Sequence, residues 1–153
     1  MPPEKPDARS QAREKLEAYL ERHHLKHTRQ REVILEAFLA SKGHMTSEEL
    51  HDRVRSDHPE IGAATVYRAL KLFSESGIAS PSYFREGVTM YEHQATHHDH
   101  LVCLGCGEIV EFECQMIEEA QTAIAVEYGY RLTHHRHDLY GYCRRCQEDG
   151  RDG

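Results

Sequence analysis

Residues 97–100 read His-His-Asp-His and lie just ahead of a Cys-x2-Cys pair, Cys103 and Cys106. A second Cys-x2-Cys pair, Cys143 and Cys146, follows near the end of the sequence. Two such pairs are typical of a four-thiolate Zn²⁺ site, whereas imidazole and carboxylate groups suit Fe²⁺, Mn²⁺, Co²⁺, Ni²⁺ or Zn²⁺. The residue types therefore predict one sulfur site and at least one site with nitrogen and oxygen ligands.

The sulfur site is predicted to be structural. Tetrahedral Zn²⁺ bound by four thiolates keeps no open coordination position, so it cannot act as a catalytic metal. It would tie the end of the sequence to the strand that follows residues 97–100. Chance spacing and a redox pair are the alternatives. The fifth cysteine, Cys114, is interpreted as a buried structural thiol.

Alternation of side chains divides residues 97–100 into two sets. In an extended segment His98 and His100 share one face, and His97 and Asp99 share the other. Glu111, on the next predicted strand, can join either face. Further candidate ligands are His44, Glu92, Glu118, His134 and His135. A single histidine is more often exposed or hydrogen-bonded than a ligand, but the clustering favours metal.

The charges are distributed unevenly and predict two domains. Residues 1–90 contain 14 Lys and Arg and 14 Asp and Glu, whereas residues 91–153 contain 5 and 12. The net charge of −7 does not exclude DNA binding, because bound cations offset acidic ligands and DNA responds to the local field. We find no apolar leader and no run long enough to cross a membrane, so we expect a cytoplasmic protein whose cysteines bind metal.

The first half is predicted to contain four helices and a β-hairpin. A helical stripe covers residues 8–23, and Thr28 is typical of an N-cap before a second helix that ends near Gly43. Residues 46–49 have the capping-box pattern. A fourth helix follows Gly62, and residues 78–92 form a hairpin with a turn at Gly87.

The fourth helix has two distinct faces. Val66, Ala69, Leu70 and Phe73 recur at helical spacing and form the buried face. The polar face contains Thr65, Tyr67, Arg68 and Lys71. This order of elements fits a winged helix-turn-helix, in which residues 63–76 enter a DNA major groove. The alternative is an ordinary helical domain with a solvated polar face.

The second half is predicted to mix strands and a helix. Residues 101–103 and 109–112 have strand patterns. Ile117, Ala120 and Ile124 indicate a helix that stops at Gly129. Residues 130–142 return to a strand pattern.

The segments HHDHLVCLGCGEIVEF and GAATVYRALKLF together resemble the ferric uptake regulator (Fur) family of metal-sensing bacterial repressors. The similarity extends over about residues 16–146, and residues 28–31 and 44–50 also match. The resemblance implies an α+β fold: a winged helix-turn-helix domain followed by a small α/β dimerisation domain. We expect a disordered tail at 1–10, a DNA-binding domain at 11–90, a metal-binding dimerisation domain at 91–148 and a tail at 149–153.

The resemblance also implies roles for individual residues. It assigns structural Zn²⁺ to Cys103, Cys106, Cys143 and Cys146. It assigns a regulatory metal site to His44, Glu92, His98, His100 and Glu111. It assigns a second site, near the dimer interface, to His97, Asp99, Glu118 and His135. The residues expected at the DNA are Lys26, near the minor groove, and Thr65, Tyr67 and Arg68.

The implied function is a metal-dependent repressor, bound as a homodimer to palindromic double-stranded operator DNA, with association into tetramers left open. Two glutamates, Glu92 and Glu111, favour the Fe²⁺-responsive branch over the peroxide-sensing branch, which tends to have aspartate. Mn²⁺ or Zn²⁺ could replace iron in vitro, and a zinc- or manganese-responsive regulator is the next alternative. A zinc hydrolase would need a general base and an open metal position, and no His-Glu-x-x-His helix is present. A non-enzymatic metal store is the remaining alternative.

Overall fold

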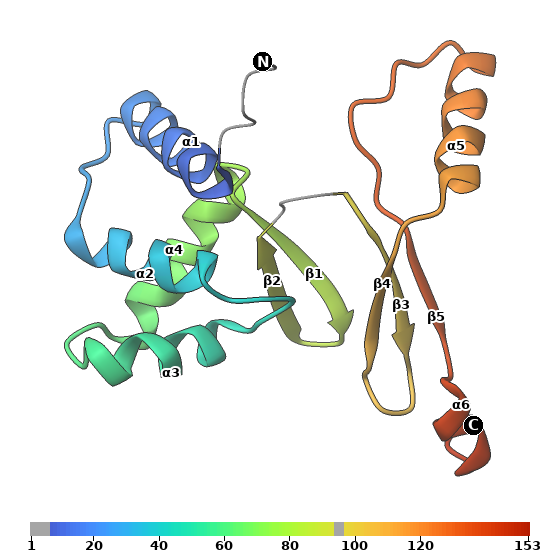
Figure 1. The fold of residues 1–153 in the computed structure, drawn as a ribbon. Helices are drawn as coiled ribbons and strands as arrows, with labels where there is room; N and C mark the ends of the chain where they lie inside the picture. The colour runs from blue at the N-terminus through green and yellow to red at the C-terminus, as the bar shows by residue number, and fades with distance from the viewer. Residues whose placement is uncertain (1–6, 94–96) are drawn as a thin grey trace. The chain divides into compact units, whose positions relative to one another are not determined.

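The computed structural model describes residues 7–93 and 97–153, which form two compact units that divide at residues 95–96 (Figure 1). The first unit contains helices α1–α4 and a two-stranded sheet. The second contains a three-stranded sheet and helices α5 and α6. This content confirms the predicted α+β class. Within the described ranges, no helix combines the length and apolarity needed to cross a membrane.

Local capping sets the starts of two helices in the first unit. Helix α1 covers Ala8–Arg22, α2 covers Arg29–Leu39 and α3 covers Ser47–Asp57. The Thr28 side chain accepts a hydrogen bond from the Arg31 backbone N–H, which confirms the predicted N-cap. Thr46 and Glu49 form the complete predicted capping box at the start of α3.

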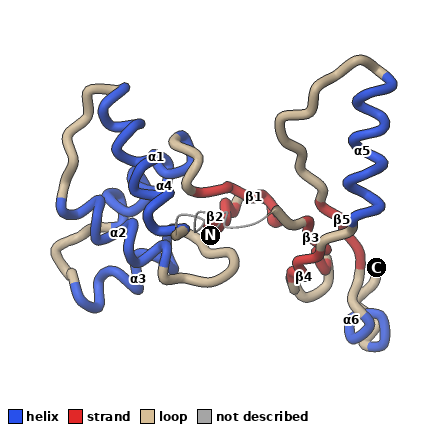
Figure 2. Tube along the Cα trace, turned by 45° about the horizontal axis from the view of Figure 1, so that its top comes forward, coloured by secondary structure: helices blue, strands red, loops and turns tan. Residues whose placement is uncertain are grey.

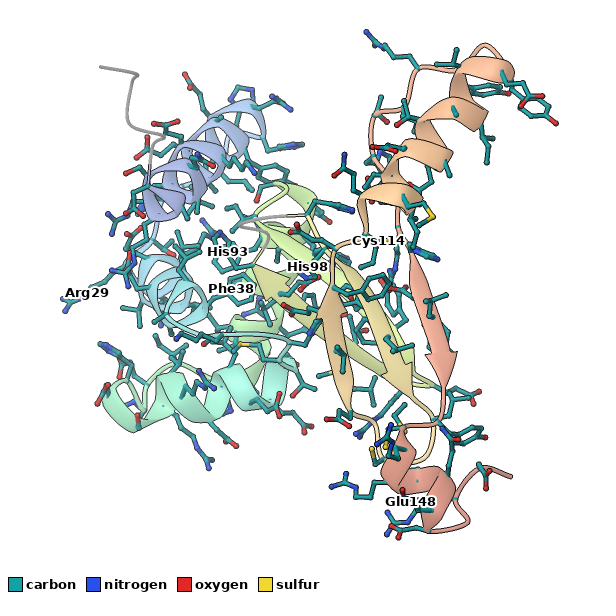
Figure 3. All side chains as sticks on the ribbon, turned by 45° about the vertical axis from the view of Figure 1, so that its right-hand side comes forward. Arg29, Phe38, His93, His98, Cys114 and Glu148 are labelled. Carbon is teal, nitrogen blue, oxygen red and sulfur yellow. The ribbon has the colours of Figure 1, made fainter. Side chains whose placement is uncertain are left out.

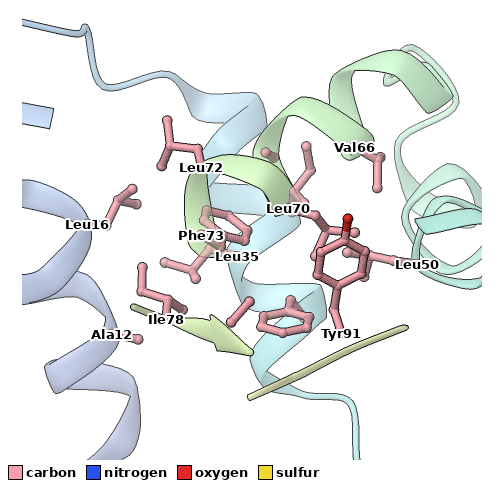
Figure 4. Close-up of a cluster of buried hydrophobic side chains, with 14 of the residues drawn as sticks. Ala12, Leu16, Leu35, Leu50, Val66, Leu70, Leu72, Phe73, Ile78 and Tyr91 are labelled. Atoms are coloured by element: carbon pink, nitrogen blue, oxygen red, sulfur yellow. The ribbon is translucent and has the colours of Figure 1, made fainter. Parts of the chain in front are cut away.

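Helix α4, at Ala63–Glu75, follows α3 after a short turn, and its apolar face is buried as predicted. Val66, Leu70 and Phe73 are almost completely inaccessible to solvent. Side chains from α1, α2, α3 and β2 converge on this face (Figure 4). Full burial of each large apolar side chain contributes about 1.5–3 kcal/mol, so this core fixes which face of α4 remains outside.

The predicted hairpin consists of β1, Ala79–Arg85, and β2, Val88–His93. The strands are antiparallel, and their register shifts between Ser82 and Arg85. Gly87 adopts φ = 74° in the connecting turn, a conformation that an L-residue with a side chain rarely takes. This hairpin after α4 completes the predicted order of a winged helix-turn-helix.

The sheet of the second unit has the strand order β4-β3-β5. Strand β3, Asp99–Cys103, pairs antiparallel with β4, Ile109–Phe112, and parallel with β5, Asp138–Gly141. Helix α5, Gln115–Glu127, connects β4 to the segment before β5, and α6, Arg144–Glu148, follows β5 (Figure 2). The central strand thus places residues 99–103 between two neighbours.

The prediction for residues 130–142 was partly wrong. Only Asp138–Gly141 forms a strand, and residues 130–137 have no regular structure. The helix with Ile117, Ala120 and Ile124 is present, but Ala125 is its only fully buried residue. Ile124 is 57% exposed, so the apolar stripe that predicts α5 is not covered within one copy of this unit.

Candidate metal centres and DNA-binding face

The four predicted sulfur ligands lie together in the second unit. The Sγ atoms of Cys103, Cys106, Cys143 and Cys146 are all within 4.8 Å of one another. Cys103 ends β3 and Cys143 follows β5, so the parallel pairing of these two strands brings the distant halves of the motif together. All five cysteines are free thiols, including half-buried Cys114, which lies at the N-cap of α5 outside this group (Figure 3). Cys114 was predicted to be a buried structural thiol, and it is only partly buried.

Backbone geometry prepares the sulfur group for a cation. N–H groups of Cys143 and Cys106 lower the pKa of the Cys103 thiol to about 6. Burial and the neighbouring thiols raise the pKa of Cys146 to about 12. Four thiolates this close repel one another, so without a cation the group keeps protons on some sulfurs. A Zn²⁺ ion would replace those protons, and this all-sulfur donor set fits it.

Gly105 is required by the packing of the sulfur site. A Cβ atom at this position would lie 2.8 Å from Cys146 Sγ and 3.2 Å from the carbonyl oxygen of Arg151. Contacts this short force atoms apart, and here one of them is a candidate metal ligand. The residue between Leu104 and Cys106 must therefore lack a side chain.

The predicted second site is also assembled within this unit. The Nε2 atoms of His97 and His135 lie 3.1 Å and 3.2 Å from Glu118 Oε1, and each lies 3.6 Å from Asp99 Oδ1. The Asp99 side chain is 1% exposed. Neither of its oxygens has a hydrogen-bond partner among the described residues. A buried, unsatisfied carboxylate is costly, and a divalent cation among these four groups would satisfy it.

Three of the five predicted regulatory ligands lie together on the opposite face of β3. The His98 and His100 rings have centroids 4.9 Å apart, and His98 Nε2 lies 3.7 Å from Glu111 Oε1. Glu111 pairs with His100 in the β3–β4 register, and paired residues point to the same face of a sheet. The Glu111 side chain therefore lies on the face of His98 and His100. The alternation predicted from sequence is thus confirmed by the contacts on both faces.

The other two predicted regulatory ligands lie together in the first unit. His44 Nε2 is 3.1 Å from Glu92 Oε2. An isolated β-bridge joins Met45 and Tyr91, with backbone N···O distances of 2.9 Å and 2.7 Å. Since Met45 follows His44 and Tyr91 precedes Glu92, this bridge brings His44 and Glu92 side by side. The structure thus brings the five ligands together in two sets, one in each unit.

A family model described as the ferric uptake regulator family matches residues 22–140. The chain belongs to this family. The ferric uptake regulation protein of Campylobacter jejuni is 42% identical over 125 residues, which are 80% of each protein. The named relatives are regulatory proteins and not enzymes, which argues against the hydrolase alternative.

Solved structures of the family have the same fold. The Helicobacter pylori ferric uptake regulator, described as having three functional metal binding sites, matches with a TM-score of 0.79 and 28% identity. The match covers 92% of this chain and 95% of that one. The Pseudomonas aeruginosa regulator, solved with manganese, matches with a TM-score of 0.75 and 31% identity over 84% and 97% of the two chains.

Three of the four residues expected at DNA are exposed in the first unit, and the fourth, Thr65, is half-buried. Tyr67 is 54% exposed, and Arg68, also exposed, donates to Thr65 Oγ1 at 3.3 Å. Lys26 is exposed in the loop between α1 and α2, and its carbonyl oxygen accepts a hydrogen bond from Arg31. The exposed face of α4 therefore offers aromatic, cationic and hydroxyl groups together.

Sequence reasoning missed two residues beside the candidate metal ligands. Asp138 Oδ1 lies 3.0 Å from His100 Nδ1, and His137 Nδ1 lies 3.5 Å from Asp99 Oδ2. His134 was a candidate ligand, but it is exposed, bonds to Thr133 and belongs to none of the ligand groups in the described residues. The strand pattern before Gly141 could have suggested pairing with β3, but it did not specify the register.

We predict that Gly105→Ala weakens zinc binding. Overpacking costs about 1–3 kcal/mol, which corresponds to about 5- to 150-fold in affinity if the site bears it all. Competition with a chromophoric chelator measures the change. Gly141→Ala is the control, because a Cβ there meets nothing within 4 Å. Equal zinc affinity in the two variants would contradict the steric role of Gly105.

Proposed function

We propose that this protein is a homodimeric, Fe²⁺-dependent repressor that acts in the cytoplasm on iron-uptake genes. Structural Zn²⁺ would be held by Cys103, Cys106, Cys143 and Cys146. The regulatory ion would be held by His44, Glu92, His98, His100 and Glu111. The second site would consist of His97, Asp99, Glu118 and His135. Family membership and the donor sets described above support this proposal.

The observation that carries the proposal is the division of the regulatory ligands between the two units. His44 and Glu92 belong to the unit that contains α4, whereas His98, His100 and Glu111 belong to the unit that contains the sulfur site. An ion bound by all five ligands would hold the two units at one angle. Ligands in a single unit would have no such effect.

A fixed angle matters because two recognition helices must match two half-sites. In a dimer, half-sites about one helical turn of DNA apart require a defined separation of the two α4 helices. His44 and Glu92 would hold the DNA-binding unit in position, and the bound cation would supply a fixed point and offset carboxylate charge. We expect binding to shift an existing equilibrium, with coupling on the order of 1–3 kcal/mol.

DNA contact would come from the exposed groups of the first unit. Tyr67 and Arg68 on α4 would meet bases or phosphates in the major groove, with Thr65 beside them. Lys26 would reach the minor groove next to it. The net charge of residues 1–90 is zero, so this unit carries less repulsion from phosphate than the acidic second unit.

Dimerisation would cover the apolar surface of the second unit. Ile124, Val126, Tyr128 and Tyr130 are all more than half exposed. Strand β5 is an edge of its sheet and carries partly exposed Leu139 and Tyr140. Ile124 and Tyr128 are one helical turn apart, and an exposed apolar stripe of this kind, like an open strand edge, is a surface that a second copy covers.

Replacement of His44 tests the coupling between the units. We predict that His44→Ala remains dimeric and retains zinc but loses metal-dependent operator binding, because the DNA-binding unit loses a ligand. Fluorescence anisotropy with and without Fe²⁺ measures this. His58→Ala is the matched control, since His58 contacts the surface residue Glu60 at 3.3 Å and belongs to none of the candidate ligand groups of the described residues. An unchanged metal response in His44→Ala would exclude the hinge mechanism.

The identity of the regulatory metal requires parallel titrations. Zn²⁺ and Ni²⁺ bind nitrogen and oxygen sites more tightly than Fe²⁺, so cellular availability would have to select iron. We predict that Fe²⁺ and Mn²⁺ both activate operator binding under anaerobic conditions, with metal content measured on the same samples. Activation by Zn²⁺ alone would assign a zinc regulator. Loss of binding with one equivalent of peroxide and oxidation of His44 or His98 would assign a peroxide sensor.

The apolar face of α5 gives a test of the dimer. We predict that Ile124→Glu shifts the protein from dimer to monomer, because a charge in the interface would lose its water without gaining a partner. Sedimentation velocity measures the shift. Glu119→Lys changes the charge at an exposed position on the side of the same helix away from Ile124, and it should leave the dimer intact. A dimeric Ile124→Glu variant would show that the interface lies elsewhere.

A further inference from the structure

The first residue of β5 and the residue just before it each face a different candidate metal-site residue on β3. His137 faces Asp99 of the second site, with Nδ1 at 3.5 Å from Oδ2. Asp138 faces His100 of the regulatory set, with Oδ1 at 3.0 Å from Nδ1. The backbone N–H of His100 donates to the His137 carbonyl oxygen at 3.2 Å, which fixes this alignment. None of the predicted ligand sets contains His137 or Asp138.

The hydrogen bond to Asp138 sets which nitrogen of the His100 ring carries the proton. Asp138 Oδ1 accepts a hydrogen bond from Nδ1, so the ring holds its proton there and Nε2 keeps its lone pair for a metal. The Arg136 Nε donates to the other oxygen, Oδ2, at 2.6 Å. Arg136 thus holds one oxygen of the Asp138 carboxylate, and the other oxygen orients the His100 imidazole.

The two oxygens of Asp99 face different neighbours. Oδ1 lies at 3.6 Å from both His97 and His135, which are candidate ligands of the same ion. Oδ2 has no hydrogen-bond partner in the described part of the chain, and neither does the buried Nδ1 atom of His137. These two unsatisfied atoms, His137 Nδ1 and Asp99 Oδ2, lie 3.5 Å apart. The Phe112 ring packs edge-on against the His137 ring, with centroids 6.3 Å apart.

We propose that His137 and Asp138 are positioning residues, one for each nitrogen and oxygen site. His137 holds Oδ2 of Asp99 so that Oδ1 faces the second-site ion, and Asp138 holds His100 so that Nε2 faces the regulatory ion. Side-chain alternation on β5 thereby matches the alternation of Asp99 and His100 on β3. The assignment rests on the ligand sets of the proposed function.

The two roles can be separated by a crossed experiment on the full-length, zinc-loaded dimer. Co²⁺ is the probe, and its binding is followed by calorimetry and by its absorption spectrum. In a His44→Ala background the remaining site is the second one, and in a Glu118→Ala background it is the regulatory one. His137→Leu should weaken only the second site, and Asp138→Ala only the regulatory site. We expect about 10- to 100-fold in each case, as is usual for groups that orient metal ligands.

Conservative variants distinguish positioning from a general structural role. His137→Asn retains a donor near the place of Nδ1 and should restore most of the second-site affinity that His137→Leu loses. Asp138→Asn retains an acceptor for His100 and should restore part of the regulatory affinity. Weakening of both sites by either variant, or equal affinities for His137→Leu and His137→Asn, would overturn the proposal.

Failure of the proposed function gives a different result. If His44→Ala removes no Co²⁺ site, the assigned regulatory ligand set is wrong. The comparison of leucine with asparagine at position 137, made in the parent protein, still decides the role of His137. Circular dichroism and the dimer mass, measured for each variant, exclude unfolding as the cause of lost affinity.

Discussion

The alternation of side chains along one short extended segment organises the chemistry of this protein. Consecutive residues of a strand point to opposite faces, so His98 and His100 cannot share a site with His97 and Asp99. The distances confirm the division on each face of β3. The other candidate nitrogen and oxygen ligands described in the second unit are placed by their relation to this segment: Glu111 through the register of β4, and Glu118 and His135 through α5 and the segment before β5.

The sulfur site lies at the other end of the same strand. Cys103 ends β3, and the backbone N–H of Cys143 donates to its sulfur at 3.3 Å. Parallel pairing needs a long connection between its strands, and here that connection contains α5. Zinc at the four thiolates would hold the far end of β5 against β3. It would thereby also keep residues 137 and 138 beside the two other sites, so a structural metal would support the positions of regulatory ligands.

The two units differ in how much of their apolar surface each one buries within itself. The first unit buries the apolar faces of all four helices in one core. The second unit buries few large apolar side chains, and the face of α5 remains open. A unit with so small a core would gain stability from a bound metal and from a partner surface that covers it. The proposed dimer and the proposed zinc site would therefore both compensate for the small hydrophobic core of the second unit.

Local interactions explain what could be predicted from the sequence. The caps at Thr28 and Thr46, the buried face of α4 and the turn at Gly87 depend on residues within a few positions of one another, and all are confirmed. The two Cys-x2-Cys pairs and the alternation in 97–100 are equally local. Tertiary structure decided the rest, because it depends on register between distant strands. The register of β5 on β3 brings His137 to Asp99 and Asp138 to His100, and only Asp138–Gly141 of the expected strand pairs with β3. No spacing in the chain encodes those contacts, since the long connection from β4 to β5 allows many registers until the core and the sulfur ligands select one.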